Sequence, residues 1–417
     1  MTTISPALAY PGASDQTAPE QTDPQGVFSL TEYADRLVRV QALMHERGMD
    51  SLVVVDPANL FYLTGYNAWS FYMPQAIIVP AAGPIHLFAR AMDAQGAHHT
   101  CCLGPEQIHG YPEHYVHRPD IHPWDWITER ALEIGVLEDG AEVVIGVETD
   151  AHFFSPRGFL ALHGRIRAAS LIDSHELVNW VRVIKSPQEQ TKLLLAGRIA
   201  TSAMTIGLEG VLAGAPQFEV VSEIQRAQAF GTPGVGGDYP AIVPMLPTGV
   251  SAGTPHLTWN QQSLRSGEAT TIELAGVHDR YHAPLARTVS LGEPTPRLRD
   301  CSEAVAEGLT AALDIFTPGT TGREVHAAFT ACIERRGFFK ESRIGYSIGI
   351  GYPPDWGERT VSLRSEEETP LAAGMAFHII LGMWQDGWGY ETSESVLLTP
   401  TGHALLTDIP QGLLVKP

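Results

Sequence analysis

The sequence predicts an α+β protein with a small N-terminal α/β domain and a larger C-terminal domain, on three observations. The chain has 417 residues, which exceeds one ordinary core because domains average about 150 residues. Strand-like and helix-like segments alternate over residues 28–184, whereas residues 185–417 combine helices with long alternating segments. A strong helix-start signal at Ser186 places the domain boundary just before it.

Residues 1–27 are rich in Pro, Ala, Thr and Gln and predict a flexible tail. They contain neither the basic start nor the apolar centre of a signal peptide. The four cysteines form no CxxC pair, which is typical of reduced thiols in the cytosol. These features together predict a cytoplasmic protein.

The N-terminal domain is expected to begin with a helix. Ser29 followed by Glu32 forms a capping box, and Gly48 is typical of a helix end. Four segments then predict strands, at residues 51–55, 75–79, 85–89 and 142–147.

The C-terminal domain begins with Ser186, Pro187 and Glu189, which supply an N-cap, a first-turn proline and a reciprocal carboxylate. Helices are predicted near residues 187–207, 216–229, 300–316 and 322–336. β segments are predicted near residues 241–246, 269–291, 375–382 and 390–399. This order favours helices that cover a curved, largely antiparallel sheet.

Charge and hydropathy exclude several classes of partner. Lys and Arg number 27 and Asp and Glu 47, which gives a formal net charge of −20. Such a surface repels phosphate backbones and anionic lipid headgroups. No apolar run approaches the ~18 residues of a membrane span. We therefore expect a small-molecule substrate and neither nucleic acid nor membrane as a partner.

Residues 269–289 alternate like a β-hairpin that turns around His278-Asp279. A symmetric hairpin pairs Glu273 with Pro284 and Ala275 with His282, and the proline favours a bulge or a sheet edge. Glu273 lies between apolar neighbours, where a carboxylate is seldom buried without a partner. It is either a catalytic group or a buried glutamate that backbone donors satisfy.

This hairpin resembles the metal-site hairpin of the pita-bread superfamily, which includes creatinase, prolidase, methionine aminopeptidase and aminopeptidase P. The five metal-ligand positions of that family correspond here to Glu273, Pro284, Tyr346, Ile380 and the pair Ser393-Glu394. Divalent metals need several converging oxygen or nitrogen donors, which proline and isoleucine side chains lack. The resemblance therefore implies a pita-bread domain without metal or cofactor, as in creatinase.

Creatinase keeps one acid/base histidine upstream of the hairpin, and the matching residue here is His256 in the segment 253–259. A histidine in such a loop is otherwise a turn residue bonded to backbone. The amino-acid sequence of several long segments resembles that of the ectoine hydrolases. These segments are residues 59–72, 253–259, 269–289, 345–360 and 388–395. This resemblance implies metal-independent hydrolysis of the cyclic amidine ectoine to N-acetyl-L-2,4-diaminobutyrate.

Opening an amidine ring requires a nucleophile or base at the carbon between the two nitrogens and an acid at the leaving nitrogen. Glu273 suits the first role, either by attacking that carbon or by deprotonating water. His256 suits the second, since its ordinary pKa lies near ~6.5. The predicted substrate-binding residues are His282, Trp69, Tyr72, Tyr346, Trp356, Glu391 and Glu394.

These binding residues have different expected roles. His282 could hold Glu273 or pack within its strand, and Glu391 or Glu394 could accept the second amidine N–H. Trp69 and Tyr72 are candidates for an aromatic wall against a cation, or for ordinary core or subunit contacts. In the superfamily the equivalent loop often reaches the partner's active site, which implies a homodimer. Arg287 and Arg359 are both candidates for the substrate carboxylate.

Two other functions fit the same residues. One is a creatinase-like hydrolase that acts on another small cationic nitrogen compound. The other is a catalytically inactive pita-bread module that binds peptides, since loss of metal ligands is equally expected there. Glu273 and His256 together favour an enzyme over such a module.

Overall fold

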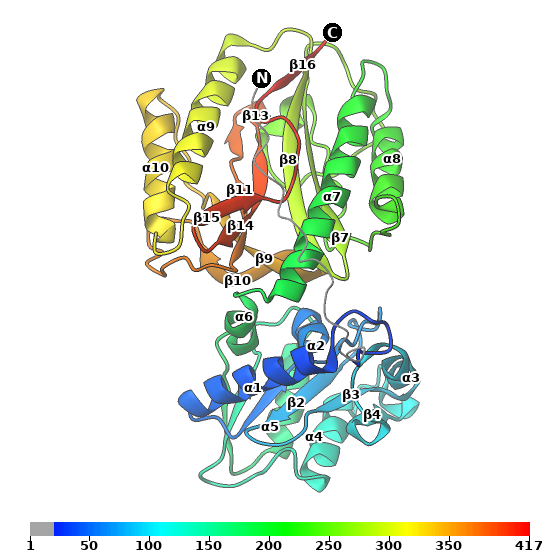
Figure 1. Ribbon diagram of the computed structural model, residues 1–417. Helices are drawn as coiled ribbons and strands as arrows, with labels where there is room; N and C mark the ends of the chain where they lie inside the picture. The colour runs from blue at the N-terminus through cyan, green and yellow to red at the C-terminus, as the bar shows by residue number, and fades with distance from the viewer. Residues whose placement is uncertain (1–20) are drawn as a thin grey trace.

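The computed structural model describes residues 21–417, which form two parts that lie end to end (Figure 1). The N-terminal part contains a six-stranded sheet, and the C-terminal part contains an eight-stranded sheet with helices on both sides. The predicted α+β class is therefore confirmed. Among the described residues, no helix is both long and apolar enough to cross a membrane.

The N-terminal sheet has the strand order β4-β3-β2-β1-β5-β6 and mixes parallel and antiparallel pairs. Helix α1 begins as predicted, since the Ser29 hydroxyl accepts the Glu32 N–H at 3.2 Å. All four predicted strands form. The elements are α1 (Leu30–Glu46), β1 (Ser51–Val54), α2 (Pro57–Thr64), β2 (Ala76–Pro80), β3 (His86–Arg90), α3 (Ala91–Thr100), β4 (Ile108–Tyr111), α4 (Pro123–Glu133), β5 (Val144–Val147), α5 (Pro156–Arg165), β6 (Ser170–Asp173) and α6 (Leu177–Arg182).

The predicted tail, residues 1–27, lies largely outside the described residues, but its last seven residues are folded. The Asp23 carboxylate accepts N–H bonds from Gln25, Val27 and Phe28, and a hydroxyl bond from Tyr33 at 2.8 Å. Residues 21–27 therefore pack against α1, contrary to the expectation of a flexible segment. The cause is local, because one carboxylate satisfies several backbone donors of the turn.

The C-terminal part begins at α7, where Ser186 and Glu189 form the predicted capping box. The predicted strand at 241–246 is wrong, because that segment makes only an isolated bridge to β7. Two strands that were not predicted, β9 and β10, form from residues 345–362. The elements are α7 (Pro187–Gly210), α8 (Gln217–Phe230), η3 (Gly249–Gly253), β7 (Ala269–His278), β8 (Tyr281–Leu291), α9 (Pro296–Asp314), α10 (Gly322–Arg335), β9 (Gly345–Tyr352), β10 (Asp355–Ser362), β11 (Ala376–Ile380), β12 (Met383–Gln385), β13 (Trp388–Tyr390), β14 (Ser393–Thr399), β15 (Gly402–Leu405) and β16 (Leu414–Lys416).

Helices α7 and α8 lie on one side of the strands, and α9 and α10 on the other (Figure 1). Helix α7 approaches β7 very closely at Gly276. A Cβ atom at this position would lie 2.1 Å from the Ala196 carbonyl oxygen and 2.2 Å from the Ala200 nitrogen. The absence of a side chain at Gly276 therefore allows α7 to lie this close to the strand that carries Glu273.

The β7–β8 hairpin differs from the predicted register. Its turn is Asp279-Arg280, both with left-handed φ, and it pairs Glu273 with Ala286 and His282 with Val277. The turn is fixed by tertiary contacts, since Asp238 accepts the Arg280 N–H at 2.9 Å and Lys192 contacts Asp279 at 2.6 Å.

Pro284 faces Ala275 in a ladder that runs without a register shift, so no bulge forms. On its other side β8 pairs only at Tyr281 and at residues 289–291, so Pro284 lies at a local sheet edge, which is the second predicted alternative. The partner of each residue moves by two positions, and an even shift keeps every side chain on its predicted face.

Candidate active site

Glu273 lies within β7 and is only 7% exposed. Its backbone is fixed on both sides of the strand, because it pairs with Ala286 on one side and exchanges two hydrogen bonds with Met245 on the other. Burial, and then the negative charge of Glu391, raise the pKa of Glu273 well above its ordinary value. The hairpin thus buries the Glu273 carboxyl group close enough to the Glu391 carboxyl group for their charges to interact.

Glu391 follows β13 and is 5% exposed. The Glu391 N–H donates to the Thr288 hydroxyl at 2.9 Å, and that hydroxyl donates to the Glu391 carbonyl at 2.8 Å. Its Oε1 atom is buried without a hydrogen-bond partner among the described residues. Burial raises the pKa of Glu391 to about 7, although the Lys340 ammonium opposes the rise. Two buried carboxyls that repel each other retain a proton near neutral pH.

Glu394 has a different environment from Glu391. Its carboxylate forms an ion pair with Arg287 at 2.6 Å and accepts the Thr407 hydroxyl at 3.1 Å. Arg287 also donates to the backbone carbonyls of Ser393 and Pro410. Both side chains are buried and bind each other. This argues against the predicted role of Glu394 in substrate binding and against Arg287 as the residue that binds the substrate carboxylate.

Tyr346 lies at the centre of a short hydrogen-bonded chain. Trp356, which is fully buried, donates its Nε1–H to the Tyr346 hydroxyl at 2.9 Å, and this hydroxyl lies 3.1 Å from His378 Nδ1. Burial raises the pKa of Tyr346, and the charge of Glu273 adds to the rise. Tyr346 and Trp356 pack in one apolar cluster with Ala275, which lies two residues beyond Glu273 on the same face of β7. The structure therefore brings Tyr346 and Trp356 together beside Glu273.

His378 is a site residue that the sequence reasoning missed. It lies on β11 directly opposite Tyr346 on β9. Burial, and then the nearby Arg343, lower its pKa to about 3, so the ring is neutral. Nδ1 then accepts from Tyr346, and the proton lies on Nε2, which has no partner among the described residues. Only the pairing of two strands distant in sequence reveals this contact.

His282 is buried, and both of its ring nitrogens are used by the backbone. Nδ1 donates to the Arg280 carbonyl at 2.8 Å, and Nε2 accepts the Ala241 N–H at 2.9 Å. Burial lowers its pKa well below the ordinary value. Neither nitrogen remains available for Glu273 or for substrate, so the structure supports the packing alternative for this residue.

His256 is exposed and has a left-handed φ of 65° in the loop after η3. This loop runs beside the site, because the Leu246 N–H bonds to the Leu257 carbonyl and the adjacent Met245 pairs with Glu273. Within the part of the chain that is described, no hydrogen bond or ion pair joins His256 to Glu273. Its acid/base role stays a prediction.

Trp69 and Tyr72 are each 59% exposed in the N-terminal part. The Trp69 ring contacts Tyr239 of the C-terminal part at 4.6 Å and Phe71 at 5.0 Å between ring centroids. Neither ring makes a described contact with Glu273. The role of the two rings as an aromatic wall stays a prediction.

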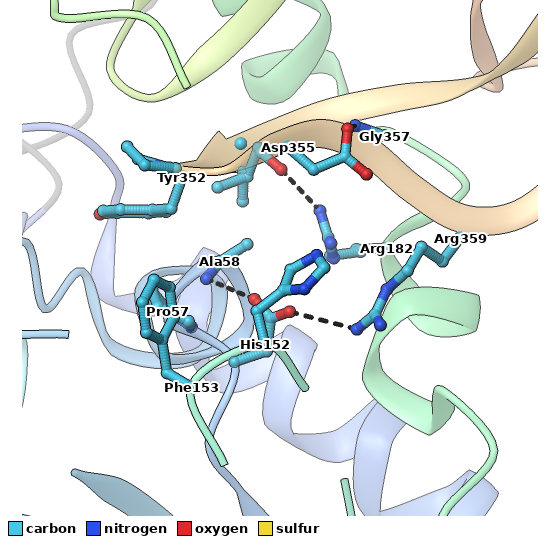
Figure 2. A pocket seen from close by; sticks show the side chains of 13 residues that line it. Pro57, Ala58, His152, Phe153, Arg182, Tyr352, Asp355, Gly357 and Arg359 are labelled. Carbon is cyan, nitrogen blue, oxygen red and sulfur yellow. Dashed lines mark hydrogen bonds and ion pairs between the residues drawn. The ribbon is translucent and has the colours of Figure 1, made fainter. Parts of the chain in front are cut away.

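Arg359 lies at the junction of the two parts rather than beside Glu273. It forms ion pairs with Asp150 at 3.0 Å and with Asp56 at 3.5 Å. Figure 2 shows it among the side chains that line the cavity there. The cavity at this junction, which His152 also lines, has a volume of about 20 Å³. That space suits roughly one water molecule. Arg359 therefore does not line a pocket that could admit a substrate.

The donor set does not fit the two metal ions that the family's hairpin would hold. Pro284 and Ile380 offer no side-chain donor, and the Glu394 carboxylate is bound to Arg287. Over residues 21–417, no group of three or more His, Cys, Asp and Glu side chains is arranged to hold a metal ion. Glu273 and Glu391 are the carboxyls that converge.

Comparisons with known proteins agree with this architecture. Residues 36–184 match the creatinase/prolidase N-terminal domain, and residues 191–400 match metallopeptidase family M24. The chain is 43% identical over 395 residues to the ectoine hydrolase of Halomonas elongata, which covers 93% of this chain and 98% of the relative.

Solved structures with the same fold include dipeptidase PepE from Mycobacterium ulcerans, with a TM-score of 0.77 and 21% identity over 93% of this chain and 99% of that one. Another is a prolidase from Thermococcus sibiricus, with a TM-score of 0.77 and 20% identity over 92% and 99% of the two chains. The predicted resemblance to the ectoine hydrolases within the pita-bread superfamily is confirmed. The chain belongs to metallopeptidase family M24 and is a hydrolase that acts on carbon–nitrogen bonds.

Proposed function

We propose that this protein hydrolyses the ring of ectoine to N-acetyl-L-2,4-diaminobutyrate without a metal ion. The observation that carries the proposal is the buried pair of Glu273 and Glu391, together with Pro284 at a metal-ligand position of the hairpin that carries Glu273. The relative named ectoine hydrolase supports the same substrate.

The charges of the pair suit a cyclic amidinium. When the two carboxyls share one proton they carry one negative charge, which balances the single positive charge of the ring. In the reaction water adds to the carbon between the ring nitrogens, one C–N bond breaks, and the departing nitrogen gains a proton. Glu273 attacks that carbon to form an ester-like adduct that water then hydrolyses. In the alternative route Glu273 takes the proton from the attacking water.

Two further groups complete the proposed mechanism. The unpartnered Oε1 of Glu391 is a ready acceptor for an amidinium N–H, because a buried acceptor without a partner is unfavourable. His256 is assigned to give the departing nitrogen its proton and to take one from water. Such acid–base assistance typically contributes about 10²–10⁴-fold.

We further propose a homodimer in which the loop that carries Trp69 and Tyr72 covers the site of the second copy. Both rings are more than half exposed and lie three residues apart on one loop, so they are accessible to a second copy. Their flat faces suit contact with a cationic ring.

Incubation of the purified protein with ectoine, followed by proton NMR, tests the proposal. We expect ring opening to the N-acetylated product. Glu273→Gln removes the nucleophile or base and is expected to lower the rate by at least about 10³-fold. Glu268→Gln, just before β7, is the matched control and should retain activity. Ectoine that stays intact with the wild-type protein refutes the proposal, and hydrolysis of a different cationic substrate favours the creatinase-like alternative.

A further inference from the structure

A cavity of about 590 Å³ opens between the loop after α10 and the turn between β11 and β12. Pockets for small ligands usually have volumes of about 300–1,000 Å³. The side chains that form its walls include Phe338, Phe339, Lys340, Met383 and Trp384. Its three aromatic rings and one cation make it suitable for a small polar ligand with an apolar ring.

Lys340 is the cation of this cavity and is only 7% exposed. Its ammonium donates to the Gly382 carbonyl at 2.7 Å and the Ser342 hydroxyl at 2.9 Å, and it lies 4.6 Å from the centre of the Trp384 ring. An ammonium has three N–H donors, and these contacts use two. The remaining donor is free for an anion.

The same lysine connects the cavity to the catalytic carboxyls. Its positive charge opposes the rise in the pKa of Glu391, and the charge of Glu391 in turn raises the pKa of Glu273. The geometry agrees with this link, because the Lys340 ammonium donates to the Gly382 carbonyl. Gly382 lies opposite Glu391, since its neighbours Leu381 and Met383 pair with Thr392 and Tyr390. Ectoine is a zwitterion with an amidinium ring and a carboxylate, so it needs a negative and a positive group at a short separation.

The other candidate cations are less suitable. Arg287 and Arg359 are committed to carboxylates of the protein. Arg343 lies over the Tyr346 ring at 4.5 Å and donates to Ser362, and it does not line the cavity.

We infer that this cavity is the substrate entrance and that Lys340 binds the substrate carboxylate while the amidinium ring faces Glu273 and Glu391. The inference rests on the proposed function, since it takes ectoine as the substrate. It adds a specificity-determining residue that selects zwitterionic cyclic amidines over simple cationic ones.

The test compares ectoine with a cyclic amidine that lacks the carboxylate. Lys340→Met should lower kcat/KM for ectoine by about 10- to 100-fold, the range for losing a hydrogen bond to a charged group, mainly through KM. Turnover of the carboxylate-free amidine should change by less than about threefold. Lys340→Arg should restore part of the loss for ectoine. Lys416→Met removes a half-buried lysine on β16, away from the cavity and the two carboxyls, and should leave both substrates unaffected.

An exposed position provides a second variant that does not depend on a buried change. Phe339 is 68% exposed at the cavity. Phe339→Glu should raise KM for ectoine and lower it for the carboxylate-free cation, whereas Phe339→Gln should do neither.

Equal losses for both substrates in Lys340→Met overturn the inference, because they indicate an effect on Glu391 alone. A KM for ectoine that is unchanged in both Lys340→Met and Phe339→Glu also overturns the inference. If the wild-type protein does not open ectoine, the proposed function itself fails.

Discussion

Replacing Glu391 by glutamine tests the acidic pair most sharply. The substitution keeps the shape of the side chain and removes the charge that repels Glu273. Glu394, three residues later, provides a contrast because its charge is balanced by Arg287 at 2.6 Å. The two glutamates are close in sequence and equally buried, yet the structure predicts opposite effects on stability.

The magnitude follows from the pKa of Glu391. Burial raises this pKa from the ordinary 4.5 to about 7. Each pKa unit corresponds to about 1.4 kcal/mol, so ionising Glu391 in the folded protein costs about 3 kcal/mol. A raised pKa contributes stability that is present below pH 4.5 and is lost as the pH rises through 7. Glutamine does not ionise. As the pH rises from 4.5 to 8.5, the free energy of unfolding of Glu391→Gln should therefore increase by about 3 kcal/mol relative to that of the wild type.

Urea unfolding at these two pH values measures the difference. Glu394→Gln should instead destabilise the protein by about 3–5 kcal/mol at pH 8.5, because it leaves a buried guanidinium without its partner. In the same Glu391→Gln variant, the pKa of Glu273 should fall, and the acidic limb of kcat/KM should move to lower pH. A stability difference between Glu391→Gln and wild type that is the same at both pH values would refute the reasoning.

Two further predictions concern the frame around the site. Trp356→Phe removes the donor to the Tyr346 hydroxyl, which keeps its bond to His378, and the loss of this buried hydrogen bond should cost about 1–3 kcal/mol in urea unfolding; an unchanged midpoint contradicts the hydrogen-bonded chain. Gly276→Ala places a methyl group 2.1 Å from the Ala196 carbonyl and should cost about 3 kcal/mol, as overpacking against backbone does. Gly164→Ala, which has open space around it, is the matched control and should be nearly neutral, so equal stabilities of the two alanine variants would contradict the close approach of α7.

Much of the fold could be predicted because its signals are local. The caps at Ser29 and Ser186 determine where α1 and α7 begin, and both act through hydrogen bonds within three residues. The burial of Glu273 also follows from its own strand, since its neighbours are apolar. The turn of the hairpin could not be placed as well, because Asp238 and Lys192 hold it from other elements.

The side chains that contact the site residues could not be predicted, because these contacts join segments that are distant in sequence. His378 contacts Tyr346 only because β9 and β11 are neighbours in the sheet. Lys340 reaches the Gly382 carbonyl from the loop after α10, and nothing in the intervening sequence indicates this. Which of Glu391 and Glu394 could accept the second amidine N–H was equally open, because the chain leaves β13 and enters β14 between them and only the fold pairs Glu394 with Arg287.

The central claim is that Glu273 opens the ring without help from a metal ion. The most direct measurement is the rate of ectoine hydrolysis by protein stripped of metals with chelators, with the residual metal content determined by elemental analysis. We predict that the rate stays equal to that of untreated protein and that added Mn²⁺ or Zn²⁺ does not raise it. A rate that disappears on stripping and returns with either ion would contradict the account.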